Sequence, residues 1–353
     1  MADNSLLRKE YSKAVGRKFL FISVCASLTV LAFGLTLTVG FFDIGIAETF
    51  SVLLDHMTGN ISDAQVDYIM WEIRLPEAIM AVSVGAALSA GGAVMQTMLR
   101  NPLADPYTMG ISAGASLGAS ISIILGFSII PGLAGGVSTI MNAFVLALVP
   151  IFIILAISRK MAVTPTKMIL SGIAVMFVFS AFTSLLMVTA SSQSLADVYA
   201  WRVGTLSRSG WEAIPLVTAI TAAGILALMS QYRKYNVLTA GEKCATALGV
   251  DPKRIMLTGM VIVAIMTATA VSFTGTIGFI GLVGPHIARV FVGSESKYLI
   301  PASSAFGALF LLCADTVAKV SGDLGLPVGV ICALVGCPIF VLILIKMKKN
   351  VWR

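Results

Sequence analysis

Few side chains of this sequence could carry acid–base, nucleophilic or metal chemistry, and their spacing does not bring them together. The two histidines, His56 and His286, are far apart in the sequence, and neither lies in an HExxH pattern or near a second metal ligand. No Ser-His-Asp arrangement is suggested, and no GxxxxGK[ST] loop is present through which the chain could hold ATP phosphates. We therefore expect no catalytic residue, no metal site and no cofactor in this chain, which is not expected to be an enzyme.

Asp315 is the one clear charge inside an apolar stretch, and it precedes Lys319 by four residues. The acid-first order at this spacing favours an ion pair on one face of a helix. Charged residues inside membrane spans often mark function, but this chain lacks the series of buried acids expected of a proton relay. The spacing therefore predicts a helix-end ion pair near the outer surface.

The composition indicates which elements must position these residues. The chain of 353 residues is 58% hydrophobic and 12% charged, with a mean hydropathy of +0.95, whereas soluble domains are about half apolar and a quarter charged. These values predict one all-α polytopic membrane domain over 1–353, with a cytoplasmic segment 1–18 and a loop 232–256. The five cysteines form no CxxC pair and are interpreted as small apolar residues without a disulfide framework. About 20 apolar residues cross a bilayer as a helix, and we expect ten spans, near 19–41, 75–98, 108–127, 138–157, 168–190, 213–231, 256–275, 279–293, 301–319 and 327–346.

The distribution of Lys and Arg predicts the orientation of these spans. Ten spans place both termini on one face, and cytoplasmic loops are enriched in basic residues. Of the 24 Lys and Arg residues, all but Arg74, Arg202, Arg208 and Lys319 fall on the face that holds the termini, whereas acidic residues gather in the first outer loop. We therefore predict cytoplasmic termini. A nucleic-acid partner is not expected, because no basic patch is interleaved with aromatic residues.

Glycine and proline spacing predicts close packing in one region and irregular backbone in two others. Gly110, Gly114 and Gly118 lie on one helix face, and small residues at this spacing let helices approach closely in lipid. Between Gly275 and Pro285 a glycine recurs every third residue, which predicts a bent or broken element because glycines destabilise a helix. The hinge 100–106 contains two prolines and cannot be continuous helix.

Three separated motifs carry a family resemblance. They are RLPEAIMAVSVGAALSAGGAVMQTMLRNPLADPYTMGIS, GTIGFIGLVGPHIAR, and ADTVAK followed by LPVGVICALVGCPIF. Over essentially residues 15–350, the sequence resembles the permeases of ABC importers for iron–siderophore complexes, haem and vitamin B12, the FecCD/BtuC-like family. The resemblance implies a ten-helix subunit of the type II importer kind that dimerises around a central translocation path. It also implies two cytoplasmic ATPase subunits, which use the ATP, and an outer substrate-binding protein, which delivers the ligand.

The resemblance assigns docking roles to two basic residues. Arg74 matches the basic residue at the outer start of the second helix, where the binding protein docks through acidic residues, and Lys319 matches a basic docking position at the outer end of the ninth helix. Family members often have a second basic residue three positions after the first, where this chain has Glu77. Either that part of the docking differs here, or Glu77 pairs with Arg74 at the i,i+3 spacing. The alternative for both basic residues is an ordinary solvated helix end.

The resemblance also assigns two cytoplasmic features. Asn101 and Leu103 match the loop that closes the translocation path on the cytoplasmic side. The segment 241–249 matches the loop that fits into the ATPase surface, and its pattern independently predicts a short amphipathic helix closed by a glycine. The coupling residues expected in this segment are Gly241, Glu242, Ala245, Leu248 and Gly249.

The expected function is import of a bulky chelate across the cell membrane of a prokaryote. An iron(III)–siderophore-type chelate is preferred because that branch of the family is the largest, with cobalamin and haem left open, as is the choice between homodimer and heterodimer. An ion-coupled secondary transporter is a second possibility, but it would need ion ligands at broken helices, and no acidic residue accompanies the 275–285 break. Residues near the outer end of the fifth span could meet ligand or form an interfacial aromatic belt: Met187, Tyr199, Trp201, Arg202 and Trp211.

Overall fold

The computed structural model describes residues 2–40, 44–160, 164–321 and 325–346, which form helices and no β-strand. Two short irregular turns, one π-helical and one 3₁₀, interrupt the α-helices. In chain order the elements are α1 (Ala2–Thr38), α2 (Ile46–Thr58), α3 (Ala64–Tyr68), η1 (Ile69–Arg74), α4 (Leu75–Leu99), η2 (Tyr107–Met109), α5 (Ile111–Leu125), α6 (Gly135–Lys160), α7 (Pro165–Val188), α8 (Ser192–Val203), α9 (Ile214–Ser230), α10 (Tyr232–Thr239), α11 (Glu242–Ala247), α12 (Pro252–Thr274), α13 (Ile280–Val292), α14 (Ser296–Val320) and α15 (Val328–Lys346).

Each of the ten predicted spans coincides with one apolar helix of the described chain. Six helical stretches are long and apolar enough to cross a membrane, namely those built on α1, α4, α6, α7, α12 and α14. The bent pair of α9 and α10 makes a seventh, and α5, α13 and α15 are shorter apolar helices. The eighth predicted span corresponds to α13, which has 13 residues and contains Pro285.

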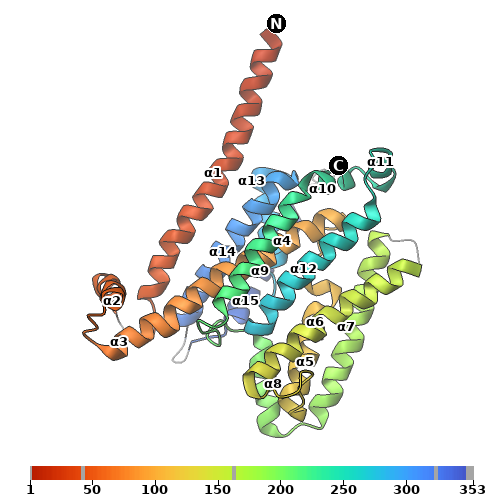
Figure 1. Ribbon diagram of the computed structural model, residues 1–353. Coiled ribbons are helices and arrows are strands. Elements are labelled where there is room, and N and C mark those ends of the chain that lie inside the picture. The colour runs from red at the N-terminus through yellow and green to blue at the C-terminus, as the bar shows by residue number, and fades with distance from the viewer. Residues whose placement is uncertain (1, 41–43, 161–163, 322–324, 347–353) are drawn as a thin grey trace.

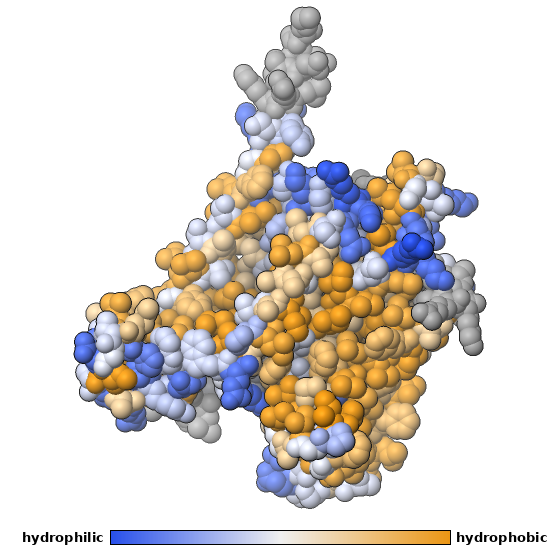
Figure 2. All heavy atoms as spheres, in the orientation of Figure 1, coloured by the Kyte–Doolittle hydropathy of each residue, from blue (hydrophilic) through white to orange (hydrophobic). Residues whose placement is uncertain are grey.

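The helix ends gather at two faces of the bundle (Figure 1). The start of α1 lies with α10 and α11 at the upper end of the view, whereas α2, α3 and α8 lie toward the opposite end. Figure 2 shows apolar residues over the middle of the bundle and hydrophilic residues gathered at its upper end, as an apolar membrane interior requires. The upper end is the face predicted to be cytoplasmic. Lys348, Lys349 and Arg353, on which part of the charge argument rests, lie outside the described residues.

The predicted first outer loop is largely helical, which its polar composition did not indicate. Two of its acidic residues, Asp63 and Glu48, accept hydrogen bonds at helix starts. Asp63 accepts hydrogen bonds from the backbone N–H groups of Gln65 and Val66 and so begins α3. Glu48 accepts from the N–H of Gly45 at the start of α2.

Helix α4 lies at the centre of the bundle and packs against α13 and α14 through glycines. A Cβ atom at Gly85 would collide with the backbone carbonyl of Gly307 on α14. A Cβ atom at Gly92 would collide with the carbonyl of Gly281 on α13. Both contacts bring backbones closer than any other residue allows, which is the packing expected of small residues on membrane helices.

The predicted glycine stripe after the hinge packs α5 against α6. Added Cβ atoms would collide with the carbonyl of Leu146 from Gly114 and with that of Asn142 from Gly118. Gly110 has a different role, because it lies just before α5 at a φ of 84° and ends the 3₁₀ turn η2. The close packing of the stripe is therefore confirmed for its two helical members.

The predicted break after residue 275 is also confirmed. Helix α12 ends at Thr274, and Gly275 takes a φ of 72°, where a Cβ atom would collide with the carbonyl of Trp201. Phe279 has a φ of 68°, a left-handed conformation that is costly for an aromatic residue, and α13 starts directly after it. Such irregular backbone is tolerated at membrane depth where protein surrounds it.

Candidate functional site

Three ionisable side chains from two helices meet at the end of the bundle that is predicted to be the outer one. The Lys319 Nζ atom lies 2.7 Å from an Asp315 carboxylate oxygen and 3.1 Å from a Glu77 carboxylate oxygen. The hydroxyl of Ser207 donates a hydrogen bond of 2.9 Å to the other oxygen of Glu77. The predicted pair of Asp315 and Lys319 is confirmed, and it is extended across the helix contact into a cluster of two acids and one base.

This cluster is buried, so its pairing has an energetic consequence. The side chains of Glu77, Asp315 and Lys319 expose 8%, 3% and 12% of their surface. Removing charges from water is costly, and breaking such a pair leaves an uncompensated buried charge. The ion-pair partner of Glu77 in this cluster is Lys319 on α14, and Glu77 also interacts electrostatically with Arg74 on the preceding turn, as the i,i+3 spacing suggested.

Arg74 is also buried rather than a solvated helix end. It ends the π-helical turn η1, is 4% exposed, and donates a hydrogen bond of 2.7 Å to the carbonyl of Leu37 at the end of α1. Its guanidinium packs against Gly40, where a Cβ atom would approach Arg74 Nη2 to 2.8 Å. The guanidinium thus ties the outer end of α1 to the start of α4.

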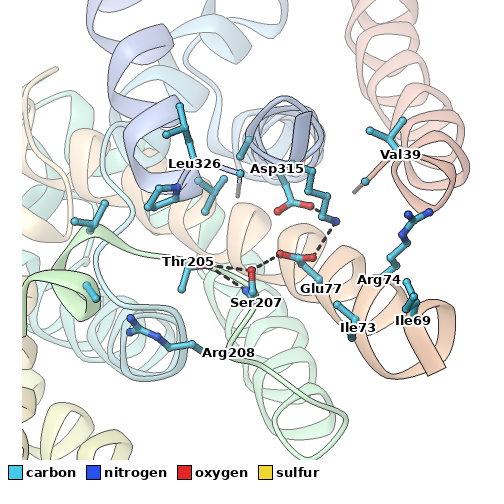
Figure 3. A pocket seen from close by; sticks show the side chains of 18 residues that line it. Val39, Ile69, Ile73, Arg74, Glu77, Thr205, Ser207, Arg208, Asp315 and Leu326 are labelled. Atoms are coloured by element: carbon cyan, nitrogen blue, oxygen red, sulfur yellow. Dashed lines mark hydrogen bonds and ion pairs between the residues drawn. The ribbon is translucent and has the colours of Figure 1, made fainter. Parts of the chain in front are cut away.

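The two predicted docking residues line the same pocket. The pocket has a volume of about 490 Å³ and lies at the outer ends of α1, α4, α14 and α15. Figure 3 shows Arg74 and Arg208 on opposite sides of the Glu77 and Asp315 carboxylates. Its polar lining residues are Arg74, Glu77, Thr205, Ser207, Arg208, Asp315 and Lys319.

Arg208 is an exposed cation of this pocket that the sequence did not single out as a site residue. It lies in the loop between α8 and α9, and it belongs to the few basic residues assigned to the outer face. The charge distribution therefore contained the signal, but the family motifs do not cover this loop. Arg202, a second such residue, contacts Met187 through a 3.9 Å guanidinium–sulfur approach.

The predicted hinge after α4 is an ordered turn held by its own side chains. Arg100 ends α4 in a left-handed conformation at a φ of 47°. The side-chain Oδ1 of Asn101 accepts a 2.9 Å hydrogen bond from the N–H of Leu103, a residue that is 49% exposed. Asp105 and Thr108 exchange three further hydrogen bonds of 2.7 to 3.2 Å, so the turn leads rigidly into η2.

Asp105 in this hinge is buried away from water. Burial raises the pKa of its carboxyl group to about 6, although hydrogen bonds from Thr108 and the Tyr107 backbone oppose that rise. The hydroxyl of Tyr107, which begins η2 directly after the hinge, accepts a hydrogen bond of 3.1 Å from the N–H of Ile277. The hinge and the turn η2 that follows it therefore lie against the break that precedes α13.

The predicted short helix of the coupling segment is confirmed as α11. It begins after Gly241, which has a φ of 108°, and the chain leaves it through Gly249, which has a φ of 75°. Ala245 is fully buried against the bundle, and its carbonyl accepts a 2.9 Å hydrogen bond from the N–H of Val250, which closes the end of α11. Leu248 is 64% exposed, and nothing lies within 4 Å of a Cβ atom placed at Gly249.

The coupling segment lies beside the hinge. A Cβ atom at Gly241 would lie 3.6 Å from an Arg100 guanidinium nitrogen. The preceding helix α10 is anchored by the buried Tyr235 and Leu238, and Asn236 accepts a 2.8 Å hydrogen bond from the N–H of Ser296 at the start of α14. The two features assigned to the cytoplasmic side are therefore neighbours in space.

A buried polar contact joins α4 to α13 between the outer cluster and the hinge. The Gln96 side-chain amide donates to the carbonyls of Gly281 and Leu282 at 3.4 Å and accepts from Arg289 Nη2 at the same distance. His286 Nδ1 lies 2.8 Å from the Leu282 carbonyl. Gln96 is fully buried, so these contacts fix the relative position of the two helices.

A second, smaller pocket of about 230 Å³ is lined by hydroxyl groups. It lies between α5, α7, α8 and the broken segment before α13. Arg202, one of the residues considered for ligand contact, borders it, whereas Trp211 instead donates a 2.9 Å hydrogen bond to the carbonyl of Trp71. The hydroxyl-bearing lining residues are Tyr107, Ser112, Ser116, Ser180, Thr183 and Thr276.

Comparison with known proteins places this architecture among membrane permeases. The family model of the FecCD transport family matches residues 28–346. The cobalamin import system permease protein of Halobacterium salinarum is 39% identical over 78% of this chain and 73% of that one. The Fe(3+)-citrate import system permease protein of Bacillus subtilis is 32% identical over 96% and 97% of the two chains. A solved metal-chelate type ABC transporter in an inward-facing conformation is 25% identical, with a TM-score of 0.81 over 92% of this chain and 99% of that one.

Proposed function

Because the chain belongs to the FecCD transport family, we propose that it is the permease subunit of an ATP-driven importer for an iron(III)–siderophore-type chelate. The observation that carries the proposal is the exposed coupling helix α11 beside the hinge that ends α4. A permease without its own phosphate-binding loop needs an ATPase, and a partly exposed helix next to a hinge is a surface on which one can act. The likeness to an iron-citrate permease over nearly the whole chain supports the choice of an iron chelate.

The proposal includes three kinds of partner. A second permease subunit completes the translocation path. Two cytoplasmic ATPase subunits bind, one to the α11 helix of each permease subunit, and an outer binding protein delivers the chelate. The chain spans the cell membrane of a prokaryote with both termini in the cytoplasm. Asn101 and Leu103 close the path at the hinge, and the hydroxyl-lined pocket contributes polar surface to it.

Docking of the binding protein takes place at the outer pocket. Arg74 and Lys319 line the interior of this pocket. Arg208 is exposed at the pocket and is the cation that an approaching acidic side chain meets first. Exposed ion pairs contribute roughly 0.2–1 kcal/mol each, whereas like charges brought together cost several. Arg208→Glu should therefore weaken the complex more than Arg208→Ala does, and high salt should reduce the difference because exposed charges are screened.

Reconstitution tests the proposal directly. The chain is placed in liposomes with the ATPase and binding protein encoded beside its gene, and uptake of an iron(III)–siderophore complex, cobalamin and haem is compared. We expect uptake of the iron chelate that depends on ATP and on the binding protein. Preference for cobalamin or haem would change the substrate, and uptake driven by an ion gradient without the ATPase would show a secondary transporter.

Labelling of single cysteines tests the orientation. In a background that lacks the five native cysteines, a cysteine at the exposed Asn60 should react with a membrane-impermeant reagent added outside intact cells. A cysteine at the exposed Ala240 should be spared. Outside labelling at Ala240 would invert the proposed topology and remove the assignment of α11 to an ATPase.

A further inference from the structure

Helix α2 presents three distinct faces, and one of them is an uncovered apolar stripe. Its stripe residues recur at i, i+4, i+8 and i+11, which places them along one side of a helix. A polar side carries Glu48, Ser51 and Thr58, and the third side packs on the bundle. The stripe residues and their exposed fractions are Ile46 at 61%, Phe50 at 50%, Leu54 at 63% and Met57 at 76%.

The packed side fixes the direction in which the stripe faces. Thr49 and Val52 are buried beneath the helix. The His56 Nδ1 atom lies 2.8 Å from an Asp67 carboxylate oxygen, and the imidazole stacks on the Trp71 indole with ring centroids 4.0 Å apart. Because α2 is held from this side, it cannot roll to bury its stripe against the bundle.

We propose that α2 is an interfacial helix that inserts its stripe into the outer leaflet of the membrane. The stripe adjoins α1, since a Cβ atom at Gly34 would lie 3.8 Å from the Phe50 ring. Helix α1 is long and apolar enough to cross a membrane, and it exposes Leu28, Val30, Leu31 and Leu35. Figure 1 shows α2 just beyond the lower end of α1 and at the side of the bundle opposite to α7. A helix at that position meets lipid at the level where the chain leaves the bilayer.

Aromatic residues beside α2 indicate the same depth. The Trp71 and Trp211 rings lie 5.4 Å apart, with the Trp211 indole N–H bonded to the Trp71 carbonyl, and Tyr68 is 59% exposed. Tryptophan and tyrosine are enriched at membrane–water interfaces because their rings are apolar at one end and polar at the other. Figure 2 shows apolar residues among hydrophilic ones over α2 and α3, as an interfacial element requires.

The charge of α2 specifies the kind of lipid surface. The helix contains no Lys or Arg and carries Glu48 and Asp55, so anionic headgroups do not attract it. Insertion therefore depends on apolar burial and is expected in a neutral bilayer. This separates α2 from basic amphipathic helices, which need anionic lipid.

An environment-sensitive fluorophore on single cysteines tests the inference. In the cysteine-free full-length chain, a nitrobenzoxadiazole probe is placed at Phe50 on the stripe, at Ser51 on the polar side, and at Leu35 on α1 as a lipid-facing control. The protein is reconstituted in nanodiscs of phosphatidylcholine with or without brominated acyl chains. We expect the Phe50 probe to match Leu35 in blue-shifted emission and quenching by brominated lipid, and the Ser51 probe to be quenched by aqueous iodide.

Two outcomes would overturn the inference. Iodide quenching at Phe50 equal to that at Ser51 would show that the stripe faces water. Shielding of Phe50 from both quenchers would show that protein covers it, either a second copy or a partner. Neither outcome bears on the transported substrate, because the experiment depends only on residence in a membrane.

Discussion

The outer charge cluster and the coupling segment are both polar regions at opposite ends of the bundle, but they differ in what their side chains contact. Glu77, Asp315 and Lys319 neutralise one another inside the protein. The coupling segment leaves Leu248 and Gly249 without such contacts and fixes only Ala245. The main role of the cluster is therefore to stabilise this chain. The exposed surface of α11 makes no contact that would stabilise the chain, and it is available to another protein.

The largest effect is expected at the coupling segment. Gly249→Arg should abolish transport while leaving the protein folded in the membrane, because a side chain at a φ of 75° is strained and a bulky cation blocks the ATPase surface. The measurements are uptake and copurification of the ATPase, with Gly249→Ala as the control for backbone strain alone. A normally coupled ATPase bound to Gly249→Arg would remove the segment from the interface.

At the outer cluster we expect the reverse, a loss of stability of the folded chain. Lys319→Gln leaves two buried carboxylates without their cation, and breaking a buried pair in this way costs about 3–5 kcal/mol. We expect a lower unfolding temperature in detergent, with partial recovery when Asp315→Asn is added. Unchanged thermal stability of Lys319→Gln would show that the cluster is not a structural element.

A smaller effect is expected from Glu77, the second acid that pairs with Lys319. Glu77→Gln keeps a hydrogen-bond acceptor for Ser207 and leaves Lys319 paired with Asp315, so stability should fall by only about 1 kcal/mol. Removing one carboxylate also leaves Lys319 more available to an acidic partner. Titration with the binding protein should show tighter docking than in the parent chain, and weaker docking would contradict the assignment of Lys319.

The smallest effect concerns the hinge and is a dependence on pH. The pKa of Asp105 is about 6 in the folded chain and about 3.9 in an unfolded one, so the folded state holds the proton more tightly. The contribution of Asp105 to the free energy of unfolding is therefore largest below about pH 4 and is lost as the pH rises to about 6. Asp105→Asn should remove this dependence, which thermal unfolding at a series of pH values measures. If the unfolding temperature depended on pH in the same way for the parent chain and for Asp105→Asn, the prediction would be wrong.

The features that could be predicted from the sequence are those set by neighbours along the chain. Apolar runs of membrane length indicated the ten helices, and proline and glycine spacing indicated the hinge at residue 100 and the break at residue 275. The Asp315–Lys319 pair followed from i,i+4 spacing on one helix. Each of these depends only on short-range geometry.

The contacts that escaped prediction join residues distant in the sequence. Glu77 and Ser207 are 130 positions apart, and their contact depends on how α4 packs against its neighbours. The burial of Arg74 depends in the same way on the end of α1. The helical structure of the first outer loop was missed because its polar residues act as caps, a role that resembles an ordinary loop composition.

Helix α4 has a mechanical consequence that follows from its glycines. Its backbone touches α14 at Gly85 and α13 at Gly92, so a shift of α4 toward either neighbour must displace that helix as well. The helix is 25 residues long, or about 37 Å at 1.5 Å per residue. It begins at the pocket that contains Glu77 and ends at the hinge that begins with Arg100, so one continuous helix connects the two. A single helix therefore spans the distance between the two faces of the protein, and its closest contacts with α14 and α13 are at Gly85 and Gly92.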